Sequence, residues 1–101
     1  MNTLSIPYML TIMVGSLSGI LKMKYSEIEQ KLNDDTTSEE FYNQLEAAEQ
    51  ILQKRQEEYR DKHPFIQHSN GGYYKFSYIG QSVFHKGVYT CNYTLVEIPA
   101  S

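Results

Sequence analysis

The sequence predicts an α+β fold, because the spacing of its apolar residues changes along the chain. Near both ends they recur at every second position, which is the period of a half-buried strand. Between residues 26 and 62 they recur at every third or fourth position, which is the period of an amphipathic helix. The chain has 101 residues, about the length of one domain, so we expect residues 1–101 to form a single α+β domain.

The first predicted element is an N-terminal β-hairpin. Leu4 to Leu21 contains no charged residue and is about as long as a membrane-spanning helix. Its apolar side chains nevertheless alternate with more polar ones, which favours a strand. The alternating residues are Leu4, Ile6, Tyr8, Leu10, Ile12 and Val14. Gly15–Gly19 is then expected to form a turn, and alternation between Leu21 and Tyr25 predicts the second strand. A membrane-anchored accessory protein is the alternative.

Two helices are expected in the middle of the chain. Ser26–Glu29 has the form of a capping box and opens a short helix that ends at 33–36. A second box, Thr37–Glu40, opens a long helix, and Pro64 ends it near Lys62. The apolar stripe of the long helix comprises Phe41, Leu45, Ala48, Leu52 and Tyr59, flanked by Ile51.

The C-terminal third predicts an antiparallel hairpin or a three-stranded meander. Ser69–Gly72 is a turn signal, and Tyr74, Phe76 and Tyr78 alternate along the strand that follows it. Tight turns are expected at 80–81 and 86–87. A long strand then runs from 88 to 98 and ends before Pro99. One face of this strand carries Tyr89, Cys91, Tyr93 and Leu95, and the other carries Val88, Thr90, Asn92, Thr94 and Val96.

These elements predict a long helix packed on one face of a four- to five-stranded sheet. The other face of such a sheet needs cover, which a partner or a second copy of the chain can provide.

Composition excludes several classes of protein. The net charge is −3 and the nine basic residues are scattered, so nucleic acid is not an expected partner. Cys91 is the single cysteine, which excludes an intrachain disulfide and favours a reducing, cytoplasmic location. The membrane is likewise not an expected partner, because strand-like alternation replaces a lipid-facing pattern.

No constellation of residues predicts catalysis, a cofactor or a metal. The soft metal ligands are His63, His68, His85 and Cys91, and they lack the close pairs of a zinc site. No glycine-rich phosphate loop is present. Cys91 falls on the apolar side of a strand, where a thiol is usually buried and inert. We therefore expect no enzyme activity.

By elimination, the sequence predicts a small protein-binding module. The expected type is an inhibitor, or an immunity or anti-defence factor, that blocks a larger enzyme or complex. The candidate partner-binding residues are Glu46, Glu49, Gln53 and Glu57 on the long helix, and Tyr73, Lys75 and Tyr89 on the sheet. The alternative is a homo-oligomer that sequesters a small ligand or nucleotide, with aromatic rings stacked on the bases.

Overall fold

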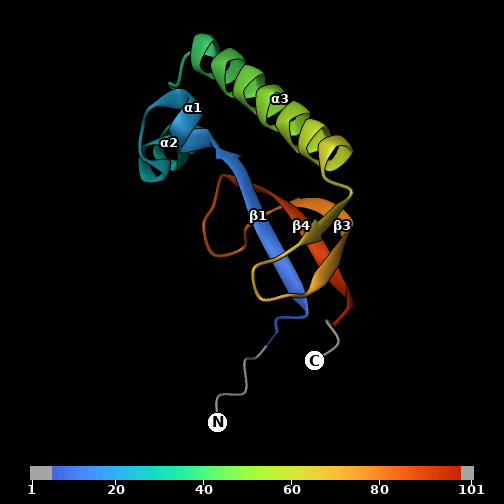
Figure 1. Cartoon of the computed structure of the whole chain (residues 1–101). Coiled ribbons are helices and arrows are strands. Elements are labelled where there is room, and N and C mark those ends of the chain that lie inside the picture. The colour runs from blue at the N-terminus through green and yellow to red at the C-terminus, as the bar shows by residue number, and fades with distance from the viewer. Residues whose placement is uncertain (1–5, 99–101) are drawn as a thin grey trace.

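The computed structural model describes residues 6–98, which form one antiparallel sheet and three helices. The elements, in chain order, are β1 (Met9–Ser16), α1 (Leu17–Leu21), α2 (Tyr25–Leu32), α3 (Glu39–Lys62), β2 (Phe65–Gln67), β3 (Tyr73–Gln81) and β4 (Val88–Glu97). The strands are ordered β1-β4-β3-β2 (Figure 1). A four-stranded sheet with the long helix on one face confirms the predicted α+β architecture.

The C-terminal strands form a three-stranded meander, as predicted, but its short outer strand is β2, which precedes the turn at 69–72 and was not predicted. The turn before β3 contains Gly71 at φ 89°, and the backbone N–H of Gly72 donates to Asn70 Oδ1 at 2.7 Å. The predicted tight turn at 80–81 is wrong, because both residues continue β3 and pair with β4. The chain reverses over 82–87, where Gly87 has φ 78°.

The predicted N-terminal hairpin is also wrong. A single strand, β1, pairs with β4, and the chain then turns directly into α1. Ser16 caps this helix, because its Oγ accepts a hydrogen bond from the Gly19 N–H at 3.0 Å. Lys22 ends it in the left-handed region, at φ 56°. Residues 21–25, expected as a strand, instead pack against the helical core; Leu4 and Pro99 lie outside the described residues.

The helix boundaries agree with the sequence better than the helix caps do. The predicted capping box at Ser26 is wrong, since α2 already begins at Tyr25 and its cap, Lys24, makes no side-chain hydrogen bond. The cap of α3 is Ser38, one residue beyond the predicted position; its Oγ accepts from the Phe41 N–H at 3.4 Å. The helix ends at Lys62, as predicted from Pro64.

The described residues pack around two apolar clusters that α3 joins. The first lies among the three helices and the start of β4, and contains Leu17, Ile28, Phe41, Leu45, Ala48, Leu52 and Tyr89. The second lies on the sheet and contains Leu10, Tyr74, Cys91 and Tyr93, with Tyr59 of α3 packed against it. The buried part of the predicted helical stripe is confirmed, whereas Ile51 is exposed.

Close contacts hold α3 against three strands. A Cβ at Gly15 of β1 would lie 2.5 Å from Leu52 Cδ2, so the helix crosses where β1 has no side chain. The buried amide of Gln56 donates from Nε2 to the carbonyls of Gly80 in β3 (2.8 Å) and Thr90 in β4 (3.0 Å). The burial of Gln56 could not be predicted from the sequence, because a glutamine among the polar residues of a helix gives no signal of burial.

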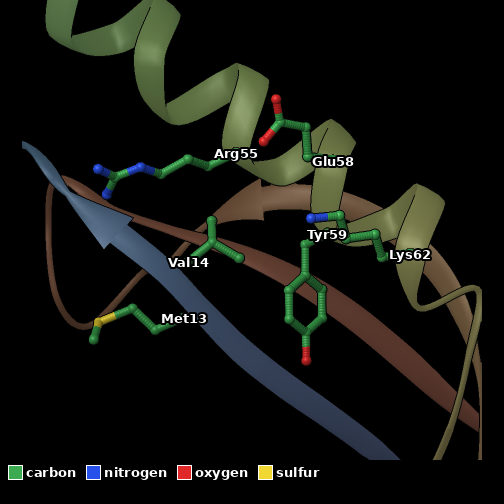
Figure 2. Close-up of a pocket in the computed structure, with 6 residues that line it drawn as sticks. All are labelled: Met13, Val14, Arg55, Glu58, Tyr59 and Lys62. Atoms are coloured by element: carbon green, nitrogen blue, oxygen red, sulfur yellow. The ribbon is translucent and has the colours of Figure 1, made fainter.

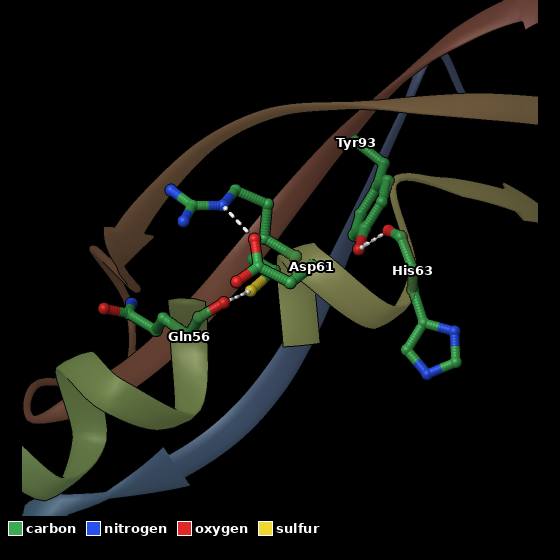
Figure 3. A network of polar contacts seen from close by, with 6 residues as sticks. Gln56, Asp61, His63 and Tyr93 are labelled. Carbon is green, nitrogen blue, oxygen red and sulfur yellow. Dashed lines mark hydrogen bonds and ion pairs between the residues drawn. The ribbon is translucent and has the colours of Figure 1, made fainter. Parts of the chain in front are cut away.

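A further hydrogen bond ties the end of α3 to β4. The buried Tyr93 donates from its hydroxyl to the His63 carbonyl at 2.6 Å (Figure 3). Further back along α3, the Gln56 carbonyl accepts a hydrogen bond from Cys91 Sγ at 3.4 Å. Burial raises the pKa of Tyr93 to about 12, and the neighbouring Cys91 and Tyr59 add to this shift.

Replacing Gly15 by alanine should lower the free energy of unfolding by about 1–3 kcal/mol, because the new methyl group would lie 2.5 Å from Cδ2 of the fully buried Leu52. Denaturant unfolding followed by circular dichroism measures the change. The matched control is Gly19→Ala in α1, where the methyl would contact only Ser16 Oγ at 3.2 Å. The control should be as stable as the parent or more so, and equal losses in both variants would contradict the close crossing.

The stability of the fold should fall as the pH rises from 10 to 12. A folded-state pKa of about 12 for Tyr93 lies above the ordinary value of 10.0, so the folded state keeps its proton longer than the unfolded state does. The stability that this protonated hydroxyl contributes is complete below pH 10. It is lost between pH 10 and 12, at up to about 1.4 kcal/mol per pH unit. Urea unfolding across this pH range measures the slope.

Tyr93→Phe should reduce that slope but not abolish it, because burial also raises the pKa of Tyr89. Tyr8→Phe, at a residue that is 70% exposed, is the matched control and should keep the parental slope. An unchanged slope in Tyr93→Phe would show that this hydroxyl is not the group responsible.

Candidate functional site

The sheet has one face beneath α3 and one face that no helix or strand of residues 6–98 covers, here called the open face (Figure 1). Leu10, Cys91 and Tyr93 point toward α3 and belong to the buried cluster. Their neighbours along each strand therefore point to the open face. These neighbours are Met9, Thr11 and Met13 of β1, Thr90, Asn92 and Thr94 of β4, Tyr73, Lys75 and Tyr78 of β3, and Phe65 and Gln67 of β2.

A β-bulge in β3 adds a tyrosine to the open face. Phe76 pairs with Tyr93 and Tyr78 pairs with Asn92, so Ser77 is the extra residue. Phe76 packs edge-on against Tyr93 in the core, with ring centroids 5.7 Å apart, whereas Tyr78 is 53% exposed on the opposite face. The prediction that Tyr74, Phe76 and Tyr78 share one face is therefore wrong beyond the bulge.

The open face presents large apolar side chains to solvent. Met9, Met13, Phe65, Tyr73, Tyr78 and Val96 are all exposed on it. The Phe65 and Tyr73 rings stack on each other at 5.7 Å. In the β3–β4 loop, Val83 is 86% exposed and Phe84 is 89% exposed. The sequence predicted turns at 80–81 and 86–87 and no role for the residues between them, so these two side chains were missed; an apolar pair between two turns was the available signal.

A hollow of about 280 Å³ lies between this loop and the open face. Its lining comprises Thr11, Tyr78, Gln81, Ser82, Val83, Phe84, Thr90 and Asn92. Thr90 and Asn92 are buried, although they lie on the open-face side of β4. Asn92 Nδ2 donates to the Tyr78 carbonyl at 3.3 Å and to Thr90 Oγ1 at 3.2 Å. The hollow is therefore polar at Thr90 and Asn92, aromatic at Tyr78 and Phe84, and lined by no charged side chain.

The candidate partner-binding residues fall on two sides of the molecule. Glu46, Gln53 and Glu57 are exposed on α3. Tyr73 and Lys75 are exposed on the open face, on the other side of the sheet. Because these groups point in opposite directions, a single flat partner surface cannot contact both.

Tyr89 and Glu49 lie between the helix and the sheet. Tyr89 was predicted to contact a partner, and this is wrong, because α3 covers it and leaves it 4% exposed. Burial raises the pKa of Tyr89, and the charge of the half-buried Glu49 adds to the shift. Tyr89 lines a small hollow of about 140 Å³ together with Gln53 and Gln56 of α3.

A groove of about 350 Å³ runs between α3 and β1. Met13, Val14, Arg55, Glu58, Tyr59 and Lys62 line it (Figure 2). Arg55 extends from the helix toward β1, and the Tyr59 ring lies between helix and sheet. Arg55, Glu58 and Lys62 make no ion pair within residues 6–98. The groove therefore presents unpaired charges of both signs beside the outer edge of β1.

The candidate metal ligands do not gather into one site. His63 follows α3 and lies against Tyr59, with ring centroids 4.5 Å apart, while His68 and His85 lie in separate turns. Within the described part of the chain, no group of three or more histidine, cysteine or acidic residues is placed to hold a metal. Cys91 is buried, and burial raises the pKa of its thiol.

None of the helices in residues 6–98 has the length and apolar character needed to cross a membrane. Comparisons with protein-family models, curated protein sequences and solved structures found no match for this chain.

Proposed function

We propose that the chain binds a protein partner through the open face of its sheet. The observation that carries this proposal is that α3 covers one face only, while the other exposes methionine and aromatic side chains. Exposed apolar side chains gathered on one face are typical of interaction sites, and aromatic residues and methionine are enriched at interface cores.

Phe84 and Tyr78 are the proposed anchors of this surface. Phe84 projects from the β3–β4 loop and Tyr78 from the bulge in β3, and both border the hollow. Aromatic side chains that become buried at the centre of an interface often contribute most of the binding energy. Lys75 is a charged residue of the open face, so a partner with an apolar surface and a nearby carboxylate would complement it.

The role we propose is that of an inhibitor, or an immunity or anti-defence factor, that covers part of a larger enzyme or complex. Such a role needs a preformed surface and no catalytic group. The sheet provides most of that surface, because the backbone hydrogen bonds of four strands fix the positions from which its side chains project. The single cysteine, Cys91, is consistent with action in the reducing cytoplasm.

The hollow on the open face supports one alternative, the sequestration of a small planar ligand. Its volume of about 280 Å³ and its rims of Tyr78 and Phe84 would suit a ring stacked on aromatic side chains. No lysine or arginine lines it, so the phosphates of a nucleotide would have no positive partner there. We therefore place this alternative second.

The double substitution Tyr78→Ser with Phe84→Ser should weaken partner binding about 30-fold, because it removes both aromatic anchors. The partner is first recovered in stoichiometric amount with tagged protein from the native host, and its dissociation constant for purified variants is then measured by calorimetry. The matched control, Glu46→Gln with Glu57→Gln, alters two exposed residues of α3 and should leave the dissociation constant within about twofold.

If the two glutamine substitutions on α3 weaken partner binding and the two serine substitutions do not, binding would be assigned to the acidic face of α3. Recovery of a bound nucleotide, visible as absorbance near 260 nm, without any protein partner would instead support the sequestering alternative.

A further inference from the structure

The outer edge of β1 carries an inference that does not depend on the proposed function. β1 has β4 on one side and no strand on the other, so the backbone groups of its outer edge have no sheet partner among residues 6–98. The strand, Met9–Ser16, has eight residues and contains no charged residue and no proline. The opposite edge, β2, has only three residues. Proteins usually protect long edges with charges, prolines or short strands, because a bare edge pairs with another chain.

The register identifies which backbone groups point outward. The Leu95 N–H donates to the Tyr8 carbonyl at 2.8 Å, so this pair is hydrogen-bonded. Antiparallel pairs alternate between hydrogen-bonded and open ones, which makes Leu10 and Ile12 the next bonded residues. Met9, Thr11 and Met13 therefore direct their N–H and C=O groups away from β4, toward the free edge.

We propose that two copies of this chain pair through β1 in an antiparallel arrangement with a twofold axis at Thr11. The free segment ends at Pro7 on one side and at the bulge between Met13 and Gly15 on the other, and Thr11 is at its centre. In this register Thr11 faces its own copy and Met9 faces Met13 of the second copy. In each of these pairs, the backbone N–H of either residue donates to the backbone C=O of the other.

The side chains of β1 suit this pairing on both faces. On the open face, Met9 and Met13 of the two copies lie side by side; singly they are 38% and 65% exposed. On the helix face, Leu10 lies opposite the half-buried Ile12 of the second copy. No charged side chain is buried against a like charge, as it would be if the edge carried lysine or glutamate.

The groove beside the edge favours a second copy over a highly charged peptide. Arg55 and Lys62 lie in it together with Glu58, and none of the three has an ion pair within residues 6–98. A peptide of one charge sign would meet a like charge in this groove. A twofold axis brings two basic residues and one acidic residue from each copy to the interface, so Glu58 of each copy has basic side chains available on the other copy.

Two double variants with the same number of new charges test the register. In M9K/M13K, lysine faces lysine at both ends of the paired segment, and dimerisation should weaken about tenfold or more. In M9E/M13K, glutamate faces lysine, so dimerisation should be restored. Within one chain, residues 9 and 13 are four apart along a strand, about 13 Å, too far to pair with each other. Sedimentation velocity over a range of concentrations gives the dissociation constants, and circular dichroism verifies that each variant is folded.

A cross-link provides a second measurement that does not depend on added charges. Thr11→Cys should form a disulfide-linked dimer under mild oxidation, because residues facing each other in a bonded pair have Cα atoms about 5.5 Å apart. Thr94→Cys, on β4 of the same face, is the matched control and should remain uncrosslinked, since three strand spacings, about 14 Å or more, would separate its two copies.

A parent chain that sediments as a monomer at every concentration would overturn the proposal and leave the edge to a different partner. Dimers that persist unchanged in M9K/M13K would overturn it as well. Failure of M9E/M13K to dimerise, or cross-linking of Thr94→Cys but not Thr11→Cys, would overturn the register. None of these results depends on the Tyr78 and Phe84 surface, so the two proposals fail separately.

Discussion

The fold depends on the close approach of α3 to the sheet. Gly15 leaves room for Leu52, and Gln56 then reaches the carbonyls of Gly80 and Thr90, so one stretch of helix is fixed to three strands. A side chain at Gly15 would lie 2.5 Å from Leu52 Cδ2, so the contact between helix and strand would have to shift. Burying a glutamine without partners is unfavourable, so the hydrogen bonds of Gln56 also define where along the sheet the helix can lie.

This crossing explains why the molecule has two apolar clusters and not one. The first part of α3 packs with α1 and α2, while its last part, at Tyr59, packs on the sheet. The radius of gyration is 17.3 Å, compared with about 13 Å for a compact domain of this length. A single helix stretched over two clusters cannot also cover the second face of the sheet. The open face and the bare edge of β1 follow from this arrangement.

The two proposed interactions are compatible in space. Pairing through β1 would join two four-stranded sheets edge to edge and place both open faces on the same side. The helices of both copies would then lie together on the other side. A dimer of this kind would present two copies of Tyr78 and Phe84 to its surroundings, so a partner with repeated sites would be held more strongly than by one chain.

The sequence by itself determined most of the secondary structure. The alternation in 73–78 and 88–98, the helical stripe from Phe41 to Leu52 and the proline after Lys62 each predict an element that the structure contains. These signals are local, because they arise from the periodicity of a helix or strand and from the restricted backbone of proline. The open face was also anticipated, since one helix can cover only one side of a sheet.

Tertiary structure decided the remaining features. Residues 21–25 alternate like a strand, yet they form the end of α1, the connection that follows it and the start of α2, because their apolar side chains gain more by packing on the helical core than by pairing with β1. Tyr89 is buried because α3 passes over it, and Tyr78 is exposed because Ser77 is an extra residue in β3. The periodicity of the sequence predicts neither feature. The burial of Gln56 follows from the same crossing. Such features depend on contacts between residues far apart in the chain, and local patterns carry no information about those contacts.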